Sequence, residues 1–241
     1  MRHALQWIRS IIFNVQMYVS MIVIALAFTP LVMLDRKWAL VWMQVFGRWV
    51  RFTARWIVGL KTEVRGEVPT GAVLIASKHQ SFLDSITLVS VLPAARFIMK
   101  KELGWIPLMG WHALRAGFIP VDRGKRGAAI KKMMADVAKG REQPGQLIIY
   151  PQGTRVAPGD EKPYKMGTAV LYGQLEQDCH PVATNVGVFW PRHGVFRKPG
   201  TAVIEFLPPI APGHTPATFM VELESAIETA SNRLIAEARG A

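Results

Sequence analysis

The sequence predicts an α/β fold in which a largely parallel, mixed sheet is flanked by helices and preceded by a two-helix, membrane-associated segment. Three observations lead to this prediction. From Lys61 onward, short apolar runs alternate with helix-like patterns, as in successive βα units. The preceding region contains a long uncharged apolar run, and a segment rich in tryptophan and arginine follows that run. We therefore assign residues 1–60 to a membrane anchor with an interfacial helix, and residues 61–241 to one folded domain.

The first apolar run, residues 11–34, contains no charged side chain. As a helix it would span roughly 36 Å, which is enough to cross a hydrocarbon core of about 30 Å. The run is too long for a signal-peptide core, and the Asp35-Arg36-Lys37 sequence after it does not resemble a small-residue cleavage site. We expect a retained membrane helix that Pro30 bends or ends.

The next segment, residues 38–60, has no acidic residue and interleaves aromatic and basic side chains. This pattern is typical of an amphipathic helix at the membrane interface. The alternative is that the aromatic side chains pack on the folded domain. Because more basic residues follow the apolar run than precede it, the C-terminal side belongs in the cytoplasm. A single span and a hairpin entering one leaflet both satisfy this rule, and the hairpin is slightly favoured.

The folded domain contains short apolar runs that predict strands, separated by longer patterns that predict helices. The strands are expected at residues 72–76, 96–99, 117–121, 146–150, 182–188 and 201–206. The helices are expected at residues 82–91, 107–115, 126–140, 165–176 and 217–238. Thr215-Pro216 marks the start of the last helix, because a threonine cap followed by proline suits a first turn.

The charge balance favours anionic partners. Lys and Arg number 29 against 17 Asp and Glu, which gives a formal net charge of +12. Lipid headgroups, phosphorylated substrates and an acidic carrier protein fit this excess. Nucleic acid is disfavoured, because the basic residues are spread through apolar segments and no zinc-finger, RNP or basic-zipper pattern occurs. We expect no metal and no bound cofactor, since we find no metal-ligand cluster, P-loop or dinucleotide fingerprint.

One motif places a histidine and an aspartate just after a predicted strand. Residues 78–85 (KHQSFLDS) follow the apolar run 72–76 and contain His79 and Asp84. A strand-to-helix junction of this kind places side chains at the carboxyl edge of the sheet, where α/β proteins bind ligands. A histidine there can accept a proton from a hydroxyl, and the carboxylate can orient it. Alternatively, Ser81 caps the helix with Asp84 as its capping-box acid, which is compatible with the first hypothesis.

Three further segments extend this motif into a pattern of four blocks. They are residues 117–123 (GFIPVDR), 150–155 (YPQGTR) and 181–191 (PVATNVGVFWP). In order and spacing the four blocks resemble those of the glycerolipid acyltransferases, in particular the bacterial 1-acyl-sn-glycerol-3-phosphate acyltransferases. The resemblance covers about residues 60–210.

The resemblance implies a reaction and a location. A fatty acyl group would pass from acyl carrier protein (ACP) or coenzyme A to the free hydroxyl of lysophosphatidic acid, forming phosphatidic acid for phospholipid biosynthesis. His79 would be the base and Asp84 its orienting partner, with no covalent acyl-enzyme. The enzyme would reside at the bacterial inner membrane, with the catalytic domain, residues 61–241, on the cytoplasmic face.

The resemblance also implies substrate-binding residues. Arg123 and Arg155 match phosphate-binding positions, and arginine suits bidentate phosphate binding. Gly153 and Thr154 would let the backbone approach the substrate and supply donors. Gln152 stands where the family more often has glutamate, which puts an ionic role for this position in doubt but keeps its shape and hydrogen-bonding capacity.

Other functions remain open at this point. The same chemistry on another acceptor, such as a lyso-aminolipid, fits the blocks equally well. A non-catalytic, basic, lipid-binding membrane protein is a different class, although a pure binder has no need of His79 and Asp84. A serine hydrolase is disfavoured because the sequence has no nucleophile elbow.

Overall fold

The computed structural model describes residues 2–122, 135, 137 and 145–240. Arg123 lies outside these residues, and so does the helix expected at 126–140 apart from two isolated positions.

The centre of the molecule is a seven-stranded mixed sheet within the described residues. Its order is β1 (Leu60–Arg65), β7 (Gly200–Phe206), β6 (Cys179–Thr184), β2 (Val73–Ser77), β5 (Gln146–Ile149), β3 (Ala95–Lys100) and β4 (Ile119–Val121). Neighbouring strands run parallel except β6 and β7, which pair antiparallel. The predicted α/β class and the largely parallel, mixed sheet are therefore confirmed.

Two details of the sheet differ from the predictions. The strand expected at 182–188 begins earlier, at Cys179, and ends at Thr184, because Val186–Val188 forms a 3-10 turn. The edge strand β1 was not predicted, since its sequence LKTEVR contains three charged residues and is largely solvent-accessible. An edge strand needs only one buried side, so its apolar pattern is weak.

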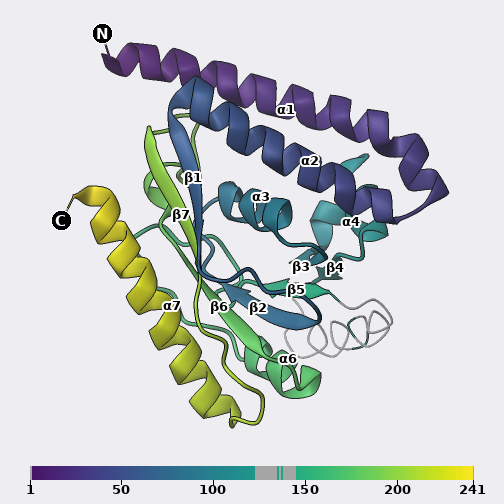
Figure 1. Ribbon diagram of the computed structural model, residues 1–241, viewed down its shortest axis with the longest axis vertical. Helices are drawn as coiled ribbons and strands as arrows, with labels where there is room; N and C mark the ends of the chain where they lie inside the picture. The colour runs from purple at the N-terminus through teal and green to yellow at the C-terminus, as the bar shows by residue number, and fades with distance from the viewer. Residues whose placement is uncertain (1, 123–134, 136, 138–144, 241) are drawn as a thin grey trace.

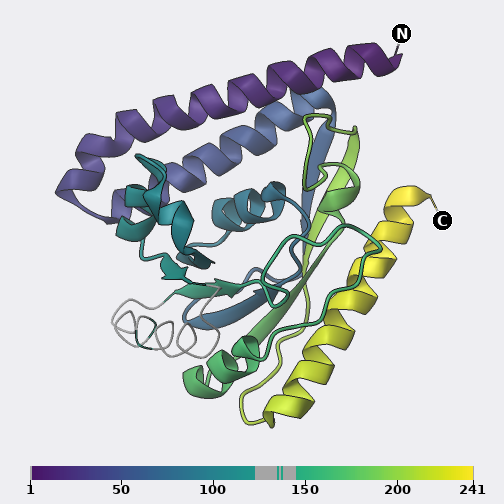
Figure 2. The same cartoon turned by 180° about the vertical axis from the view of Figure 1, so that it is seen from behind.

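Both faces of the sheet are covered, as is usual for parallel strands. On one face lie α3 (Phe82–Val91) and α4 (Met109–Arg115), and on the other lie α6 (Gly167–Leu175) and α7 (Pro216–Arg239) (Figures 1 and 2). Successive residues of β2 alternate between these layers: Ile75 packs with the α3 side, whereas Leu74 and Ala76 pack with the α7 side. Because β2 pairs parallel with both β5 and β6, the carboxyl ends of these three strands share one edge of the sheet.

The N-terminal segment is a helical hairpin laid over α3. Helix α1 (Arg2–Leu34) runs antiparallel to α2 (Lys37–Thr53), which continues as one π-helical turn at Ala54–Val58 (Figure 1). Pro30 does not end α1, which continues for one more turn to Leu34. The length and composition of α1 would allow it to cross a bilayer, and only 17% of its most apolar window is buried.

The aromatic residues of α2 and of the π-helical turn that continues it are found in both expected environments, packed on the domain and exposed. Trp42 and Phe46 are buried against the domain, whereas Trp49 and Trp56 are 41% and 71% exposed. The same helix therefore packs on α3 with one face and leaves aromatic side chains open on the other.

Candidate active site

His79 and Asp84 meet at the carboxyl end of β2. Nδ1 of His79 lies 3.0 Å from Oδ2 of Asp84, and the Asp84 side chain is fully buried. Because a carboxylate has no proton to donate, the imidazole carries its proton on Nδ1 and leaves Nε2 as an acceptor. The arrangement can therefore take a proton from a group that approaches Nε2.

The same Asp84 oxygen also caps α3. It accepts hydrogen bonds from the backbone N–H groups of Gln80 (2.6 Å) and Ser81 (2.7 Å), while the Ser81 hydroxyl accepts from the N–H of Leu83 (3.2 Å). This is the capping box expected from the sequence. Asp84 thus caps the helix and contacts the histidine at the same time, and both sets of contacts fix its position.

Tyr150, at the end of β5, supports the imidazole from one side. Its ring stacks on that of His79 with the centroids 3.8 Å apart and the planes 14° apart. Its hydroxyl is 2.7 Å from the Ser85 hydroxyl on α3. Burial, and secondarily the Asp84 carboxylate, raise the pKa of Tyr150 well above its usual value, so it remains a neutral phenol. It was not singled out from the sequence.

A cavity of about 660 Å³ opens at His79 and has two chemically different ends. One end is apolar and lies between the N-terminal hairpin, α3 and the strand ends; it is lined by Met21, Trp42, Met43, Phe46, Ile86, Val89, Phe97 and Phe118, among others. The other end is formed by Arg155 and residues of the 190–197 segment; it is basic and includes Arg155, Arg192 and Arg197. Lys100 also lines the cavity. In the part of the chain that the structure describes, no aspartate or glutamate lines this cavity. It suits a molecule with a long apolar chain and an anionic group.

Arg155 is held at the basic end by a reciprocal contact with Arg192. Nη1 of Arg155 donates to the carbonyl of Arg192, and Nη1 of Arg192 donates to the carbonyl of Arg155, each at 3.1 Å. Within the described ranges, neither guanidinium has a carboxylate within salt-bridge distance. Two like charges held together in this way favour binding of an anion.

The other residues of the third block have different surroundings. Gln152 is buried, its Nε2 donates to the carbonyl of Lys162 (3.1 Å), and it does not line the cavity at His79. Gly153 has a φ of +68°, and a Cβ there would lie 2.7 Å from Nζ of Lys165. Thr154 is half-buried and does not line this cavity either. The structure therefore brings His79, Asp84 and Arg155 together, and it places Gln152, Gly153 and Thr154 in the loop that carries Arg155.

The fourth block, residues 181–191, contacts the first block, residues 78–85, and holds it in place. The Gln80 side chain accepts a hydrogen bond from the backbone N–H of Gly187 (2.9 Å), where a Cβ would lie 2.9 Å from Gln80 Cβ. Asn185 bridges β7 and α7, since its Oδ1 accepts from the N–H of Val203 (2.7 Å) and its Nδ2 donates to the carbonyl of Leu234 (3.0 Å). These contacts fix the segment that leads into residues 190–197, which include Arg192 and Arg197.

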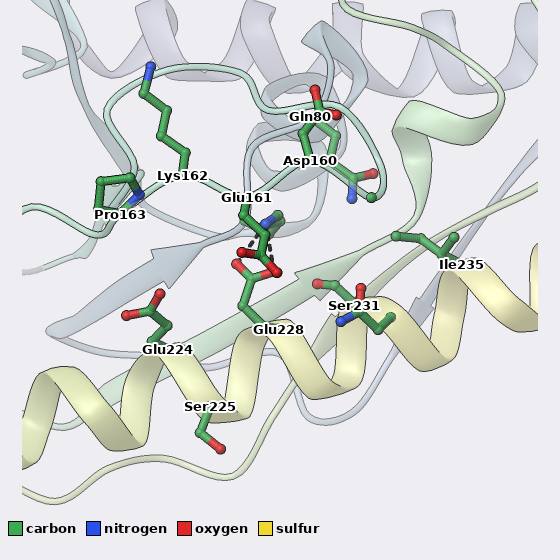
Figure 3. A pocket seen from close by; sticks show the side chains of 13 residues that line it. Gln80, Asp160, Glu161, Lys162, Pro163, Glu224, Ser225, Glu228, Ser231 and Ile235 are labelled. Atoms are coloured by element: carbon green, nitrogen blue, oxygen red, sulfur yellow. Dashed lines mark hydrogen bonds and ion pairs between the residues drawn. The ribbon is translucent and has the colours of Figure 1, made fainter.

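A second cavity, of about 600 Å³, lies on the α7 side of the same strand end. Figure 3 shows Glu224, Glu228 and Ser231 on α7 along one wall, with Gln80 and Asp160 opposite. The buried Lys78 forms an ion pair with Glu228 at 2.6 Å and 2.7 Å, and Glu228 also accepts from the Tyr164 hydroxyl at 2.8 Å. This network holds Lys78, the residue before His79, against α7.

Comparisons with known proteins agree with this geometry. A family model described as Acyltransferase matches residues 61–185, just over half of the chain. The chain is similar to the 1-acyl-sn-glycerol-3-phosphate acyltransferase of Pseudomonas aeruginosa, with 28% identity over 199 residues, 80% of this chain and 77% of that protein. It is 32% identical over 165 residues to the 1-acyl-sn-glycerol-3-phosphate acyltransferase alpha of Mus musculus, which is 66% of this chain and 58% of that protein.

The fold is also similar to a solved structure, that of the 1-acyl-sn-glycerophosphate (LPA) acyltransferase PlsC from Thermotoga maritima. The TM-score is 0.79 at 18% identity, and the match covers 95% of this chain and 97% of that one. At this identity the likeness concerns the fold. The family match covers the segments that carry His79, Asp84 and Arg155, and it shows, with the curated relatives, that the chain is an enzyme of the acyltransferase family.

Proposed function

We propose that this protein transfers a fatty acyl group from a thioester donor, acyl-ACP or acyl-CoA, to the free hydroxyl of lysophosphatidic acid, forming phosphatidic acid. The observation that carries the proposal is that His79 lies in a single cavity with an apolar end and a basic end. A lysophosphatidate has the same two parts, an acyl chain and a phosphate. The names of the similar proteins from Pseudomonas aeruginosa and Mus musculus support the same acceptor.

In the proposed reaction, His79 acts as the general base. Nε2 takes the proton of the acceptor hydroxyl as its oxygen attacks the thioester carbonyl carbon. The C–S bond then breaks, the carbonyl is restored in the new ester, and His79 returns the proton to the departing thiolate. Asp84 holds the imidazole through Nδ1 and stabilises the imidazolium that forms in between.

Arg155 is proposed to bind the acceptor phosphate, which would set the distance between the free hydroxyl and His79. The substrate-binding roles of Arg123, Gln152, Gly153 and Thr154 remain proposals that come from the family resemblance. For Gln152 the surroundings support an indirect contribution, because its amide holds the 150–165 loop through the carbonyl of Lys162.

We further propose that the N-terminal hairpin enters one leaflet of the bacterial inner membrane, with the domain on the cytoplasmic face. Helix α1 contacts the domain near both of its ends: Gln6 donates to the carbonyl of Arg197 (2.8 Å), and Arg115 donates to the carbonyl of Val32 (2.7 Å). A helix that contacts the domain near both of its ends fits a position in the plane of the membrane better than a transmembrane span that projects away from the domain.

One assay tests the function. The full chain in detergent or in vesicles is offered labelled acyl-ACP or acyl-CoA with lysophosphatidate, a lyso-aminolipid or a monoacylglycerol, and the products are identified by mass. We expect phosphatidate from lysophosphatidate, and at least about a hundredfold less of it with His79→Ala. Transfer only to the lyso-aminolipid would move the assignment to that acceptor, and release of free fatty acid alone would indicate a hydrolase.

A further inference from the structure

We propose that Arg197 is a phosphate-binding residue of the catalytic cavity and that Asn14 of helix α1 is its positioning residue. Helix α1 then builds part of the active site in addition to any role at the membrane. The inference deepens the function proposed above and rests on it.

Arg197 is a buried cation whose partners are all neutral. It is 5% exposed, and its Nη2 donates to Oδ1 of Asn14 (2.7 Å) while its Nη1 donates to the carbonyls of Gly194 (3.0 Å) and Phe196 (3.2 Å). The guanidinium lies over the Trp190 ring, 4.3 Å from the centroid, and its Nε has no hydrogen-bond partner in the described part of the chain. Burial lowers the pKa of Arg197 to about 10, so the side chain stays charged near neutral pH.

A desolvated charge of this kind is costly unless an anion compensates it. Arg197 lines the same cavity as His79, together with Arg155 and Arg192, and the described residues supply no carboxylate to this lining. A phosphate entering this end would provide the missing negative charge and acceptors for the remaining N–H groups, because arginine binds phosphate with several donors at once.

Helix α1 fixes the geometry of this cation through a polar stripe at four-residue spacing. Gln6, Ser10 and Asn14 all face the 194–197 loop: Gln6 donates to the carbonyl of Arg197, Ser10 accepts from its N–H (3.0 Å), and Asn14 donates to the carbonyl of Val195 (2.9 Å). Asn14 alone in this stripe also contacts the guanidinium. It therefore orients the charge, whereas the other two residues hold the backbone.

The test separates loss of the Arg197 charge from loss of the contacts that anchor the 194–197 loop. The full chain is compared with Arg197→Gln, Arg197→Lys and Asn14→Ala. Gln6→Ala is the control for loop anchoring. Arg51→Gln is the control for a partly buried arginine with neutral partners outside the cavity, since Arg51 donates to the hydroxyls of Thr62 and Ser90. Acceptor and donor Michaelis constants are each measured at saturating co-substrate, with monoacylglycerol as the acceptor that lacks phosphate.

We expect Arg197→Gln to raise one Michaelis constant by about tenfold to a hundredfold, the loss of a charge-assisted contact, with kcat within a few-fold. Arg197→Lys should recover part of this, and Asn14→Ala should show a smaller rise. The rate with monoacylglycerol should not change if the phosphate belongs to the acceptor, and it should fall at subsaturating thioester if the phosphate belongs to the donor. A rise for lysophosphatidate assigns the phosphate to the acceptor, and a rise for the thioester assigns it to the donor's phosphopantetheine; both support the site. Unchanged constants, or equal effects in the two controls, would overturn it.

A binding readout keeps the inference separate from the reaction. We expect sn-glycerol 3-phosphate, but not glycerol, to raise the thermal unfolding temperature of the wild-type protein, and the shift to be lost in Arg197→Gln. If the wild-type protein failed to acylate lysophosphatidate, the proposed function would fall while this readout still tested Arg197. Equal shifts in the wild type and in Arg197→Gln would refute the site directly.

Discussion

At the residue scale, one oxygen of Asp84 accepts from two backbone N–H groups and faces the imidazole of His79. The helix cap and the orientation of the imidazole therefore depend on the same atom. Substitutions at Asp84 should affect folding and turnover together, whereas substitutions at His79 should affect turnover alone.

We expect His79→Ala to reduce turnover by about two to four orders of magnitude, the usual contribution of a positioned general base, with little change in stability. Asp84→Ala should be nearly as harmful and should also destabilise the fold by about 1 kcal/mol or more, because the cap of α3 is lost. Asp84→Asn keeps an oxygen for the two amides and should retain more stability than Asp84→Ala. Turnover and thermal unfolding are measured on the same preparations; activity within a few-fold in folded His79→Ala would refute the mechanism.

Tyr150 allows the stacking contact to be separated from its hydroxyl. Tyr150→Phe keeps the ring against His79 and removes only the contact with Ser85, so we expect kcat/KM to change by no more than a few-fold. Tyr150→Leu removes the aromatic face and should cost about tenfold, because a mispositioned base is an inefficient one. A larger loss in the phenylalanine variant than in the leucine variant would instead give the hydroxyl a direct part in the reaction.

At the element scale, the contact between α2 and α3 depends on one glycine. A Cβ at Gly47 would lie 2.8 Å from Cβ of Ser90 and 2.9 Å from the carbonyl oxygen of Ile86. The two helices can approach this closely only because Gly47 has no side chain, and the approach sets the position of α3, which carries Asp84 and Ser85.

Gly47→Ala should therefore destabilise the protein by about 1–3 kcal/mol, the usual effect of overpacking. Gly173 is the matched control, since it lies in α6 with nothing within 4 Å of a Cβ. Gly173→Ala should stabilise the fold by about 0.5–1 kcal/mol through helix propensity. Thermal or denaturant unfolding checks both values, and a stabilising Gly47→Ala would show that the helices are free to separate.

At the scale of the whole molecule, the hairpin presents an apolar surface away from the domain. The outward side chains of α1 that are about half exposed or more include Leu5, Ile8, Ile12, Val15, Val19, Ile22, Val23 and Leu26. Its opposite face is buried, with Phe13, Met17, Ala25 and Val32 in the core that also contains α2 and α3. A deletion through α2 would uncover that core, so point substitutions test the membrane role better than truncation.

We expect high salt to leave the protein on vesicles and detergent to release it. Inserting each exposed aliphatic side chain contributes about 1.5–3 kcal/mol, against about 1 kcal/mol for each basic residue near an anionic surface. Ile22→Asp on α1 should weaken flotation with vesicles, whereas Val221→Asp, at a 72% exposed valine of α7, should not. Release of the wild type by salt alone, or equal effects of the two substitutions, would contradict an apolar anchor.

The sequence by itself determined the parts of this protein that depend on short-range signals. Apolar runs located six of the strands, and Ser81 and Asp84 placed the start of α3 at Phe82, because caps and periodicity act within a few residues. The four blocks, through their family resemblance, predicted site roles for His79, Asp84 and Arg155; in the structure His79 and Arg155 line one cavity and Asp84 contacts His79. The strand β1 was not predicted, because an edge strand is buried on few of its residues and therefore has only a weak apolar pattern.

Tertiary structure alone decided which distant segments meet. Asn14 and Arg197 are 183 positions apart, and Gln80 and Gly187 are 107 apart, yet each pair is joined by a hydrogen bond. No local pattern encodes such contacts, because they follow from how the hairpin packs on α3 and how the sheet orders its strands. The polar residues of α1 interrupt an apolar helix in the sequence; only the fold shows that they hold the basic end of the cavity at His79.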